Sequence, residues 1–473
     1  MLSDAKRSVF WSGVQQVTVF GLQLVTTLII ARLITPEDYG IIAMTIVFFS
    51  IAQVILDFGM EGALIQKKEC KQEDYDTAFF FSTAMSLLFY CGFYLASGWI
   101  AGFFAIPQLE KVIKISAAML VIRAIGIAPY SKMQRELRFR NLARISAAVT
   151  LFSGAVAIYM AYKGFAYWAL IAQTLLSAAA MTLLYFAASK WFPRFRISGK
   201  SFRQLVSFGF PMMLTSLINA VYNNLYTLVI GKKFDKKQLG LFNRAATFAG
   251  YVPTNLSDFS QRALFPIFSR YQDDLPLLRQ QAVRTMHLTA FVAVPLNLFF
   301  LVNASDIISL VLKDRWIDIV PMIRLLCAAH LSYIVCNIHM NLFKAIKRTD
   351  RLFICETTKK ILGVIILVVT LPLGIMPMIW GLLAFNFINI VIGALFVHPL
   401  VGLDLKDHLK SLVPTTAVAI ASVLAAYYPA SLIENIYARV ITSGITAALL
   451  FLGVSKLIKD EAVPFFLGYF RRR

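Results

Sequence analysis

Three arginines interrupt apolar stretches of this chain, and their guanidinium groups could bind phosphate. Arg123, Arg244 and Arg324 each stand among Ile, Leu, Val, Ala and Phe residues. A guanidinium stays charged when buried, and its planar fork of donors matches phosphate or pyrophosphate oxygens bidentately. If these stretches span a membrane, an Arg facing lipid is costly. The three side chains should therefore face a hydrated cavity, or else snorkel to the membrane surface, which suits Arg244 and Arg324 near the ends of their stretches.

Amides and phenols form a second group of candidate binding residues. Asn219, Tyr222 and Asn223 lie in one apolar stretch, and Gln16 and Gln23 lie in the first stretch of the chain. Such side chains offer sugars hydrogen-bond donors, acceptors and a stacking surface without a fixed charge. Polar residues also hold membrane helices together, at about 0.6 kcal/mol per bond. Both interpretations are open at this point.

Two pairs of charged residues are candidates for gating or ion coupling. Asp57 and Glu61 are four residues apart, which predicts one helix face near the inner end of a span. Membrane carboxylates should face protein or water, so they either serve gating or coupling, or pair with a Lys or Arg of a nearby loop. Glu356 and Lys360 have the spacing of a pair within one helix, as an alternative to a coupling role.

No pattern of catalytic or metal-binding residues is present in the sequence. The five His show no HExxH spacing, the five Cys show no ligand spacing, and there is neither a P-loop nor a GxSxG motif. We therefore expect no enzyme activity, no bound metal and no cofactor. A coupling ion, H⁺ or Na⁺, is compatible with the sequence.

The elements that position these residues are membrane-spanning helices. Of 473 residues 59% are hydrophobic and 15% charged, with a mean hydropathy of +0.70. About fourteen apolar runs are each long enough to cross the bilayer as a helix. Four of them matter below: Val9–Ile34 (first), Ile41–Ile65 (second), Leu241–Phe268 (eighth) and Leu352–Leu371 (eleventh). The sequence predicts an all-α membrane protein.

The basic residues predict how the helices are oriented. The net charge of +21 comes from Lys and Arg in short gaps between apolar runs, which argues against a nucleic-acid-binding face. With both termini cytoplasmic, the inner loops and tails hold about three times as many Lys and Arg residues as the outer loops, as the positive-inside rule requires. The outer loop with Lys232, Lys233, Lys236 and Lys237 opposes the rule.

An internal repeat organises the first twelve predicted spans. At an offset of 200 residues Arg32 and Gly40 align with Lys232 and Gly240, and at an offset of 210 Arg138 and Gly164 align with Arg348 and Gly374. Two parallel six-helix halves are a known transporter plan. We predict an N-terminal lobe (1–189, spans 1–6), a cytoplasmic linker (190–204), a C-terminal lobe (205–400, spans 7–12), and spans 13–14 with a cytoplasmic tail (401–473).

Five segments resemble a known family. They are ARLITPEDYG (31–40), DFGMEGALIQ (57–66), PYSKMQRELRFRNLA (129–143), SQRALFPIFSRYQDD (260–274) and LKDRWIDIVPMIRLL (312–326). Together they resemble the Wzx-type, colanic-acid-exporter-like polysaccharide flippases of the multidrug/oligosaccharidyl-lipid/polysaccharide superfamily. The resemblance implies two six-helix lobes in a V plus two extra C-terminal helices. It also implies that the chain flips a polyprenyl-pyrophosphate-linked oligosaccharide across the bacterial inner membrane by alternating access.

The resemblance also implies partners and leaves two alternative functions open. The partners would be the lipid-linked oligosaccharide, membrane lipids and other glycan-assembly proteins. A drug or cation antiporter of the same superfamily would depend on a buried carboxylate for coupling. A membrane glycosyltransferase or ligase would need longer catalytic loops than this chain has.

Two of these segments carry residues typical of the membrane surface. Arg135, Arg138 and Arg140 are expected beside the cytoplasmic headgroups, as anchors or as pyrophosphate contacts. Trp316 is expected in an outer loop at the headgroup interface, where Trp is enriched.

Overall fold

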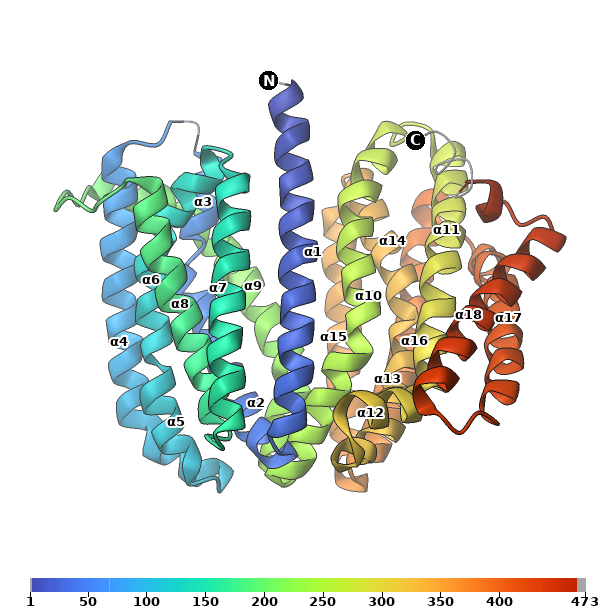
Figure 1. The fold of residues 1–473 in the computed structure, drawn as a ribbon. Coiled ribbons are helices and arrows are strands. Elements are labelled where there is room, and N and C mark those ends of the chain that lie inside the picture. The colour runs from blue at the N-terminus through green and yellow to red at the C-terminus, as the bar shows by residue number, and fades with distance from the viewer. Residues whose placement is uncertain (1, 68, 466–473) are drawn as a thin grey trace. The chain divides into compact units, whose positions relative to one another are not determined.

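The computed structural model describes residues 2–67 and 69–465, and the side chains of residues 2–17, 252 and 254–267 lie outside this description. The regular structure of the described part is helical (Figure 1), as predicted. The chain divides into two compact units, Met1–Asn243 and Arg244–Arg473.

The first unit is a helical bundle in which α2, α6, α8 and α9 come together. Figure 1 shows α4, α6, α7 and α8 as neighbouring helices, and α9 packs against α2, α3 and α4. The helices are α1 (Leu2–Leu33), α2 (Pro36–Asp57), α3 (Met60–Gln66), α4 (Gln72–Phe104), α5 (Gln108–Ser116), α6 (Ala118–Arg135), α7 (Phe139–Tyr162), α8 (Trp168–Ser189) and α9 (Gly199–Lys233).

The second unit is built around α11, which packs against α13, α14 and α17. Helices α17 and α18 pack against each other, and α16 packs against α13, α14 and α15. The elements are α10 (Lys236–Arg270), which begins in the first unit, α11 (Leu275–Val302), α12 (Ala304–Leu312), η1 (Asp314–Ile319), α13 (Val320–His330), α14 (Ser332–Ala345), α15 (Thr349–Thr370), η2 (Leu371–Leu373), α16 (Ile375–Val401), α17 (Leu405–Ala430) and α18 (Ile436–Leu457).

Eleven helices of the described part are long and apolar enough to cross a membrane. They coincide with eleven of the predicted spans. The other three predicted spans, the first, eighth and eleventh, fall on α1, α10 and α15, which are helical but are not among the eleven. The predicted number of fourteen crossings therefore stays a prediction.

The start of α2 follows from local sequence. The Thr35 hydroxyl accepts a hydrogen bond from the Asp38 backbone N–H at 3.3 Å, and the Asp38 carboxylate accepts from the Thr35 N–H at 3.4 Å. Pro36 occupies the first turn, where its missing N–H costs nothing. A capping box depends only on residues three apart, so the local sequence alone fixes this start of α2.

The backbone repeats at the two offsets seen in the sequence. Helix α1 ends at Leu33 and α2 begins at Pro36, while α9 ends at Lys233 and α10 begins at Lys236, each 200 residues later. At the second offset Arg138 and Arg348 are both N-caps, and Leu137 and Lys347, like Gly164 and Gly374, share positive φ. The compact division after Asn243 places α9 in the first unit, and the predicted lobe boundaries stay a prediction.

The two equivalent hairpins of the 200-residue repeat meet through their glycines. A Cβ on Gly40 would overlap the carbonyl oxygen of Lys236, and a Cβ on Gly240 would overlap that of Pro36. Each hairpin thus places its glycine against the carbonyl of the first helical residue of the other hairpin, so the contact is reciprocal. Only glycine allows the backbones of α2 and the first turn of α10 to approach so closely.

Two sequence predictions about local structure differ in part from the structure. The predicted span Ile41–Ile65 matches the membrane-length stretch Pro36–Gln66. It is not one continuous helix, because Phe58 and Gly59 take left-handed backbone conformations that separate α2 from α3. The Trp316 side chain is fully buried in the second unit, so it does not anchor the chain by contact with lipid headgroups.

Candidate functional site

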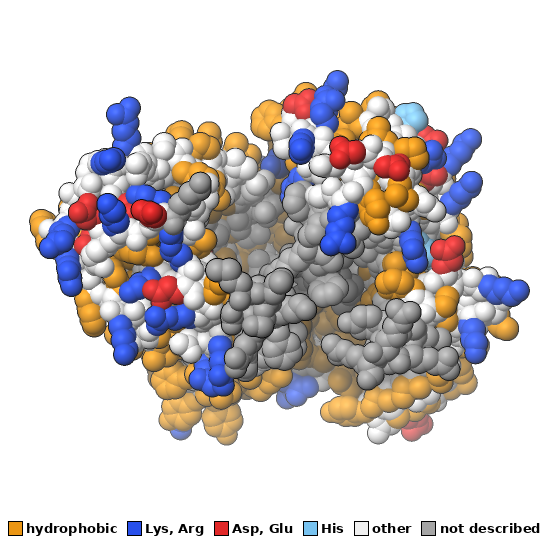
Figure 2. All heavy atoms as spheres, turned by 90° about the horizontal axis from the view of Figure 1, so that it is seen from above, with side chains coloured by type: hydrophobic (Ala, Val, Ile, Leu, Met, Phe, Trp, Pro, Cys, Tyr) orange, Lys and Arg blue, Asp and Glu red, His pale blue; other side chains and the backbone are white. Residues whose placement is uncertain are grey.

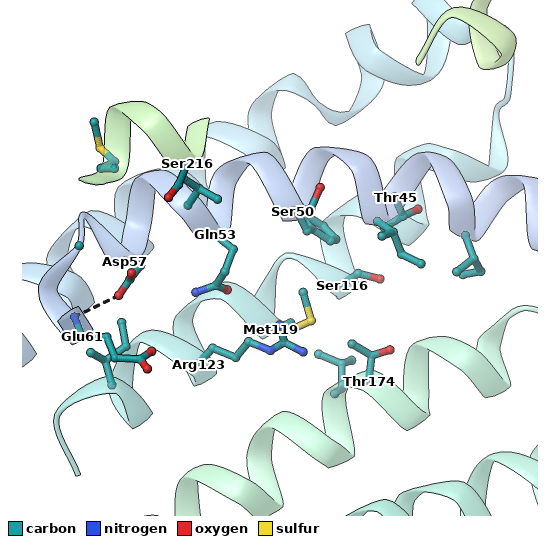
Figure 3. Close-up of a pocket in the computed structure, with 18 of the residues that line it drawn as sticks. Thr45, Ser50, Gln53, Asp57, Glu61, Ser116, Met119, Arg123, Thr174 and Ser216 are labelled. Carbon is teal, nitrogen blue, oxygen red and sulfur yellow. Dashed lines mark hydrogen bonds between the residues drawn. The ribbon is translucent and has the colours of Figure 1, made fainter. Parts of the chain in front are cut away.

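A cavity of about 700 Å³ lies inside the first unit. It is lined by side chains of α2, α3, α6, α8 and α9 and by Ser116 at the end of α5 (Figure 3). Its size suits a small-molecule or headgroup site. Much of the wall is apolar, so the few polar groups define what the cavity can bind.

One face of α2 supplies most of these polar groups. Ser50, Gln53 and Asp57 are spaced by three and four residues, which aligns them on the cavity side of the helix. Thr45 lies farther along the same helix, at the other end of the cavity from Asp57 (Figure 3). Gln53 is notable because its Oε1 is buried and has no hydrogen-bond partner in the described part of the chain.

The break between α2 and α3 places two carboxylates at one end of the cavity. Asp57 is the last residue of α2, and its Oδ1 accepts a hydrogen bond from the Glu61 backbone N–H at 3.3 Å, drawn in Figure 3. A Cβ on Gly209 of α9 would overlap the Phe58 carbonyl oxygen, so the break packs directly on α9. Within the described residues neither carboxylate pairs with a Lys or Arg, so the predicted loop ion pair is not found there.

Arg123 enters the same cavity from α6. Its side chain extends between Gln53 and Thr174, with the guanidinium on the side away from the two carboxylates (Figure 3). Arg123 makes neither a hydrogen bond nor an ion pair with the described residues. The side chain does not snorkel out of the bundle, because it lines an internal cavity.

The cavity therefore combines one unpaired cation with hydroxyl and amide groups. Ser116 Oγ, like Gln53 Oε1, is buried without a protein partner in the described part. The guanidinium, the Ser116 hydroxyl and the Gln53 amide N–H groups can donate hydrogen bonds to a phosphate or pyrophosphate group, whereas Gln53 Oε1 can only accept. Asp57 and Glu61 would repel such an anion at their end of the cavity, and two neighbouring carboxylates suit a cation instead.

The other polar residues predicted on α9 and α1 do not line this cavity. Asn219 and Asn223 are exposed on α9, Tyr222 is half-buried, and Gln23 is exposed on α1. Their roles stay predictions. The side chain of Gln16 lies outside the described residues.

The remaining predicted site residues belong to the second unit. Arg244 is half-buried on α10 and Arg324 is exposed on α13. Glu356 forms a salt bridge with Lys359, three residues later in α15, at 2.9 Å. Lys360, the next residue of this helix, is half-buried. The pair within the helix is thus made by Lys359. Any coupling role of Glu356 and Lys360 stays a prediction.

Sequence reasoning missed several lining residues and one structural role. Ser50, Gln53, Ser116 and Thr174 line the cavity, and their helical spacing inside apolar runs was a signal that could have found the α2 residues. Arg135 donates to the backbone carbonyls of Leu64, at 2.9 Å, and Lys67, so it closes the carboxyl end of α3. It supports the cavity wall, which the surface-anchor interpretation did not foresee.

Comparisons of sequence point to one family. The family described as "Polysaccharide biosynthesis protein" matches residues 29–321. The lipopolysaccharide biosynthesis protein WzxC of Escherichia coli K12 is 26% identical over 85% of this chain and 82% of its own length. The teichuronic acid biosynthesis protein TuaB of Bacillus subtilis 168 is 24% identical over 90% of this chain and 88% of its own length.

Comparisons of structure agree with this fold. The lipid II flippase MurJ, in an inward closed conformation, superposes with a TM-score of 0.75 over 96% of this chain and 99% of MurJ, at 17% identity. An inward-facing multidrug MATE transporter superposes with a TM-score of 0.59 over 82% of this chain and 98% of its own, at 12% identity. The chain therefore has the fold of these transporters.

The family match covers the helices that form the cavity, from the end of α1 to η1. The apolar helices and the transporter fold show a multi-pass membrane protein. With more than half of its length matched, the chain belongs to the polysaccharide biosynthesis protein family, and its relatives include a lipopolysaccharide biosynthesis protein and a teichuronic acid biosynthesis protein.

Proposed function

We propose that this protein is a flippase that moves a polyprenyl-pyrophosphate-linked oligosaccharide across the bacterial inner membrane by alternating access. Its relatives carry names of polysaccharide biosynthesis, and one, ExoT of Rhizobium meliloti, is named a succinoglycan biosynthesis transport protein. The fold it shares with MurJ supports the same class of transport.

The observation that carries the proposal is the unpaired guanidinium of Arg123 in the cavity. The described residues supply no partner for this charge, so a ligand anion is the natural one. A pyrophosphate fits the planar fork of the guanidinium, and the Gln53 Nε2–H groups and the Ser116 hydroxyl can donate further hydrogen bonds. The polyprenyl tail would stay in lipid while headgroup and glycan cross through the protein.

Asp57 and Glu61 serve coupling in this proposal. They would bind a cation, H⁺ or Na⁺, at the end of the cavity opposite Thr45, and its release would change the charge that the pyrophosphate meets. The cation and the anion would thereby influence each other's binding, which is the basis of coupled transport.

The proposed orientation puts both termini in the cytoplasm. Figure 2 shows Lys and Arg side chains gathered on the end of each unit that is seen from above. Arg138 and Lys190 belong to loops of the first unit, between α6 and α7 and between α8 and α9. The positive-inside rule supports the cytoplasm as the side of these loops.

The proposal predicts how glycan export depends on Arg123. In cells that need this protein for surface glycan, Arg123→Ala should abolish export, and Arg123→Lys should leave a fraction, because Lys keeps the charge but lacks the fork. Arg144→Ala removes an exposed Arg of α7 that is not part of the cavity and should export normally. Export at the wild-type level by the Arg123→Ala protein, with equal membrane abundance, would overturn the proposed role.

One observation favours a second candidate function. Two carboxylates without a basic partner among the described residues line the cavity, as a drug or cation antiporter would require. The two functions differ in their ligand. An antiporter would move organic cations and lose that activity in Glu61→Gln, whereas a flippase would move the lipid-linked glycan and depend on Arg123.

A further inference from the structure

A pair of buried histidines in the second unit lies outside the cavity and has no part in the proposed function. His339 on α14 and His408 on α17 are fully buried. Their Nε2 atoms are 2.7 Å apart, and the rings are tilted by 65°. The separation is that of a hydrogen bond, in which one nitrogen must carry the proton and the other must accept it.

The surrounding backbone fixes which nitrogen carries each proton. His408 Nδ1 lies 2.7 Å from the carbonyl oxygen of Asp404, which can only accept, so Nδ1 carries a hydrogen. A neutral His408 then has its lone pair on Nε2, and His339 must donate from its own Nε2. In the neutral state the nitrogen lone pair that is not used in these hydrogen bonds is therefore on His339 Nδ1.

This last lone pair is left open inside the protein. His339 Nδ1 is buried and has no hydrogen-bond partner in the described part of the chain. It faces Gly393 of α16, where a Cβ would overlap the ring. Buried polar atoms are nearly always satisfied, so an open acceptor at the end of a hydrogen-bonded chain suggests that it is filled in another state.

We propose that His339 and His408 form a proton-binding site within the second unit. A proton that arrives at His339 Nδ1 allows the Nε2 proton of His339 to move to His408 Nε2. His408 then carries two N–H groups and donates to both Asp404 O and His339 Nε2, so every hydrogen bond survives with the donor and acceptor of the central one exchanged. A second proton would leave two donors facing each other and would break this hydrogen bond between α14 and α17.

The charges around the pair suit one added proton. On α15 the buried ammonium of Lys359 is neutralised by Glu356. Beside His408 the carboxylates of Asp404 and Asp407 face one guanidinium, Arg279 of α11, which lies 2.8 Å from Asp407 and 3.9 Å from Asp404. These five Lys, Arg, Asp and Glu side chains have a net charge of −1, which favours a positive charge on the histidine pair.

Other titratable groups also lie near the pair, and some of them contact members of this cluster. His398 of α16 bonds to Asp404 at 2.6 Å, and His287 of α11 bonds to Asp460 at 2.7 Å. Cys336 on α14 and Cys355 on α15 are free thiols. The hydrogen-bonded histidine pair is therefore distinguishable from the other three histidines, of which His330 bonds to the Ala249 carbonyl.

The experiment is nitrogen NMR of the ¹⁵N-histidine-labelled protein in liposomes, since the chain has five histidines in all. The imidazole shifts report each tautomer and its charge directly. Near pH 8 we expect His408 protonated on Nδ1 and His339 on Nε2, and one charge should appear on the pair as the pH falls to about 5. Both rings staying neutral over this range would overturn the proposal, because the bond would then be only structural.

Variants assign the charge to the pair. In His408→Gln the nitrogen shifts of His339 should report a different tautomer population and should no longer change together with those of residue 408 as the pH falls. His330→Gln should leave both rings as in the wild type. If His408→Gln fails to fold, His339→Gln tests the same bond from the other side, with unchanged His398 signals as the folding check. A His339 titration that is unchanged by His408→Gln would also overturn the proposal.

A transport measurement connects this site to function and rests on the proposed flippase activity. The wild-type transport rate should differ several-fold between pH 6 and pH 8, and His339→Gln should lower that ratio while keeping activity. A preserved ratio in His339→Gln would contradict the site. Loss of glycan transport by the wild type at every pH would refute the flippase proposal and leave the NMR result standing.

Discussion

At the residue scale, the cavity of the first unit has a positive and a negative region, one formed by an arginine and the other by two carboxylates. Arg123 extends toward Thr174, while Asp57 and Glu61 cluster at the other side (Figure 3). All three were predicted from sequence, because a charged residue inside an apolar run is conspicuous. Gln53 and Ser116 were missed, because a single neutral polar residue in such a run is common in membrane helices.

The carboxylates provide the first prediction at this scale. Glu61→Gln and Asp57→Asn each remove a negative charge while keeping size, so each should lower the transport rate at least about tenfold if a cation binds there, equivalent to ~1.4 kcal/mol. The measurement is initial transport rate against cation concentration. Glu69→Gln, an exposed carboxylate after α3, is the matched control. Wild-type rates in both variants would remove Asp57 and Glu61 from coupling.

At the element scale, local signals predicted helix ends better than helix breaks. The capping box at Thr35 was predictable because all its atoms belong to neighbouring residues. The break at Phe58 and Gly59 was not, because it depends on contact with Gly209, some 150 residues away along the chain. The burial of Trp316 was not predictable for a similar reason, since it comes from tertiary packing.

The reciprocal glycine contact gives a prediction at this scale. Gly40→Ala and Gly240→Ala place a Cβ against the carbonyl oxygens of Lys236 and Pro36, so each should destabilise the protein by ~1–3 kcal/mol. The readout is thermal unfolding in detergent. Gly92→Ala on α4 has no atom within 4 Å of the added Cβ and should stabilise by up to ~1 kcal/mol.

An equal effect of Gly40→Ala and Gly92→Ala would show that the two hairpins do not depend on close approach. A loss of transport in Gly40→Ala with unchanged unfolding temperature would instead assign the contact to the transport cycle.

At the scale of the whole molecule, the repeat was visible in the sequence because its turns need the same residues twice. Gly164 and Gly374 both have positive φ, and the helix boundaries recur at the same offsets. The compact units were less predictable. The division after Asn243 groups α9 with α2, α3 and α4, a matter of packing between helices distant in sequence.

The topology gives a prediction at this scale. Reporter fusions after Leu457 and at the start of the chain should both report the cytoplasm, because Lys and Arg are concentrated in the loops of that side. A reporter after Lys233 should report the periplasm despite its lysines. A carboxyl terminus on the periplasmic side would mean that one of α1, α10 and α15 does not cross the membrane.

The central claim is that the chain moves a lipid-linked oligosaccharide and that Arg123 binds its pyrophosphate. The most direct measurement is translocation of a polyprenyl-pyrophosphate oligosaccharide into proteoliposomes of the purified protein, followed by the access of a glycan-modifying enzyme added outside. The wild type and Arg144→Ala should translocate the glycan lipid, Arg123→Lys should do so slowly, and Arg123→Ala should match empty liposomes. Equal translocation by the wild type and Arg123→Ala would contradict the account.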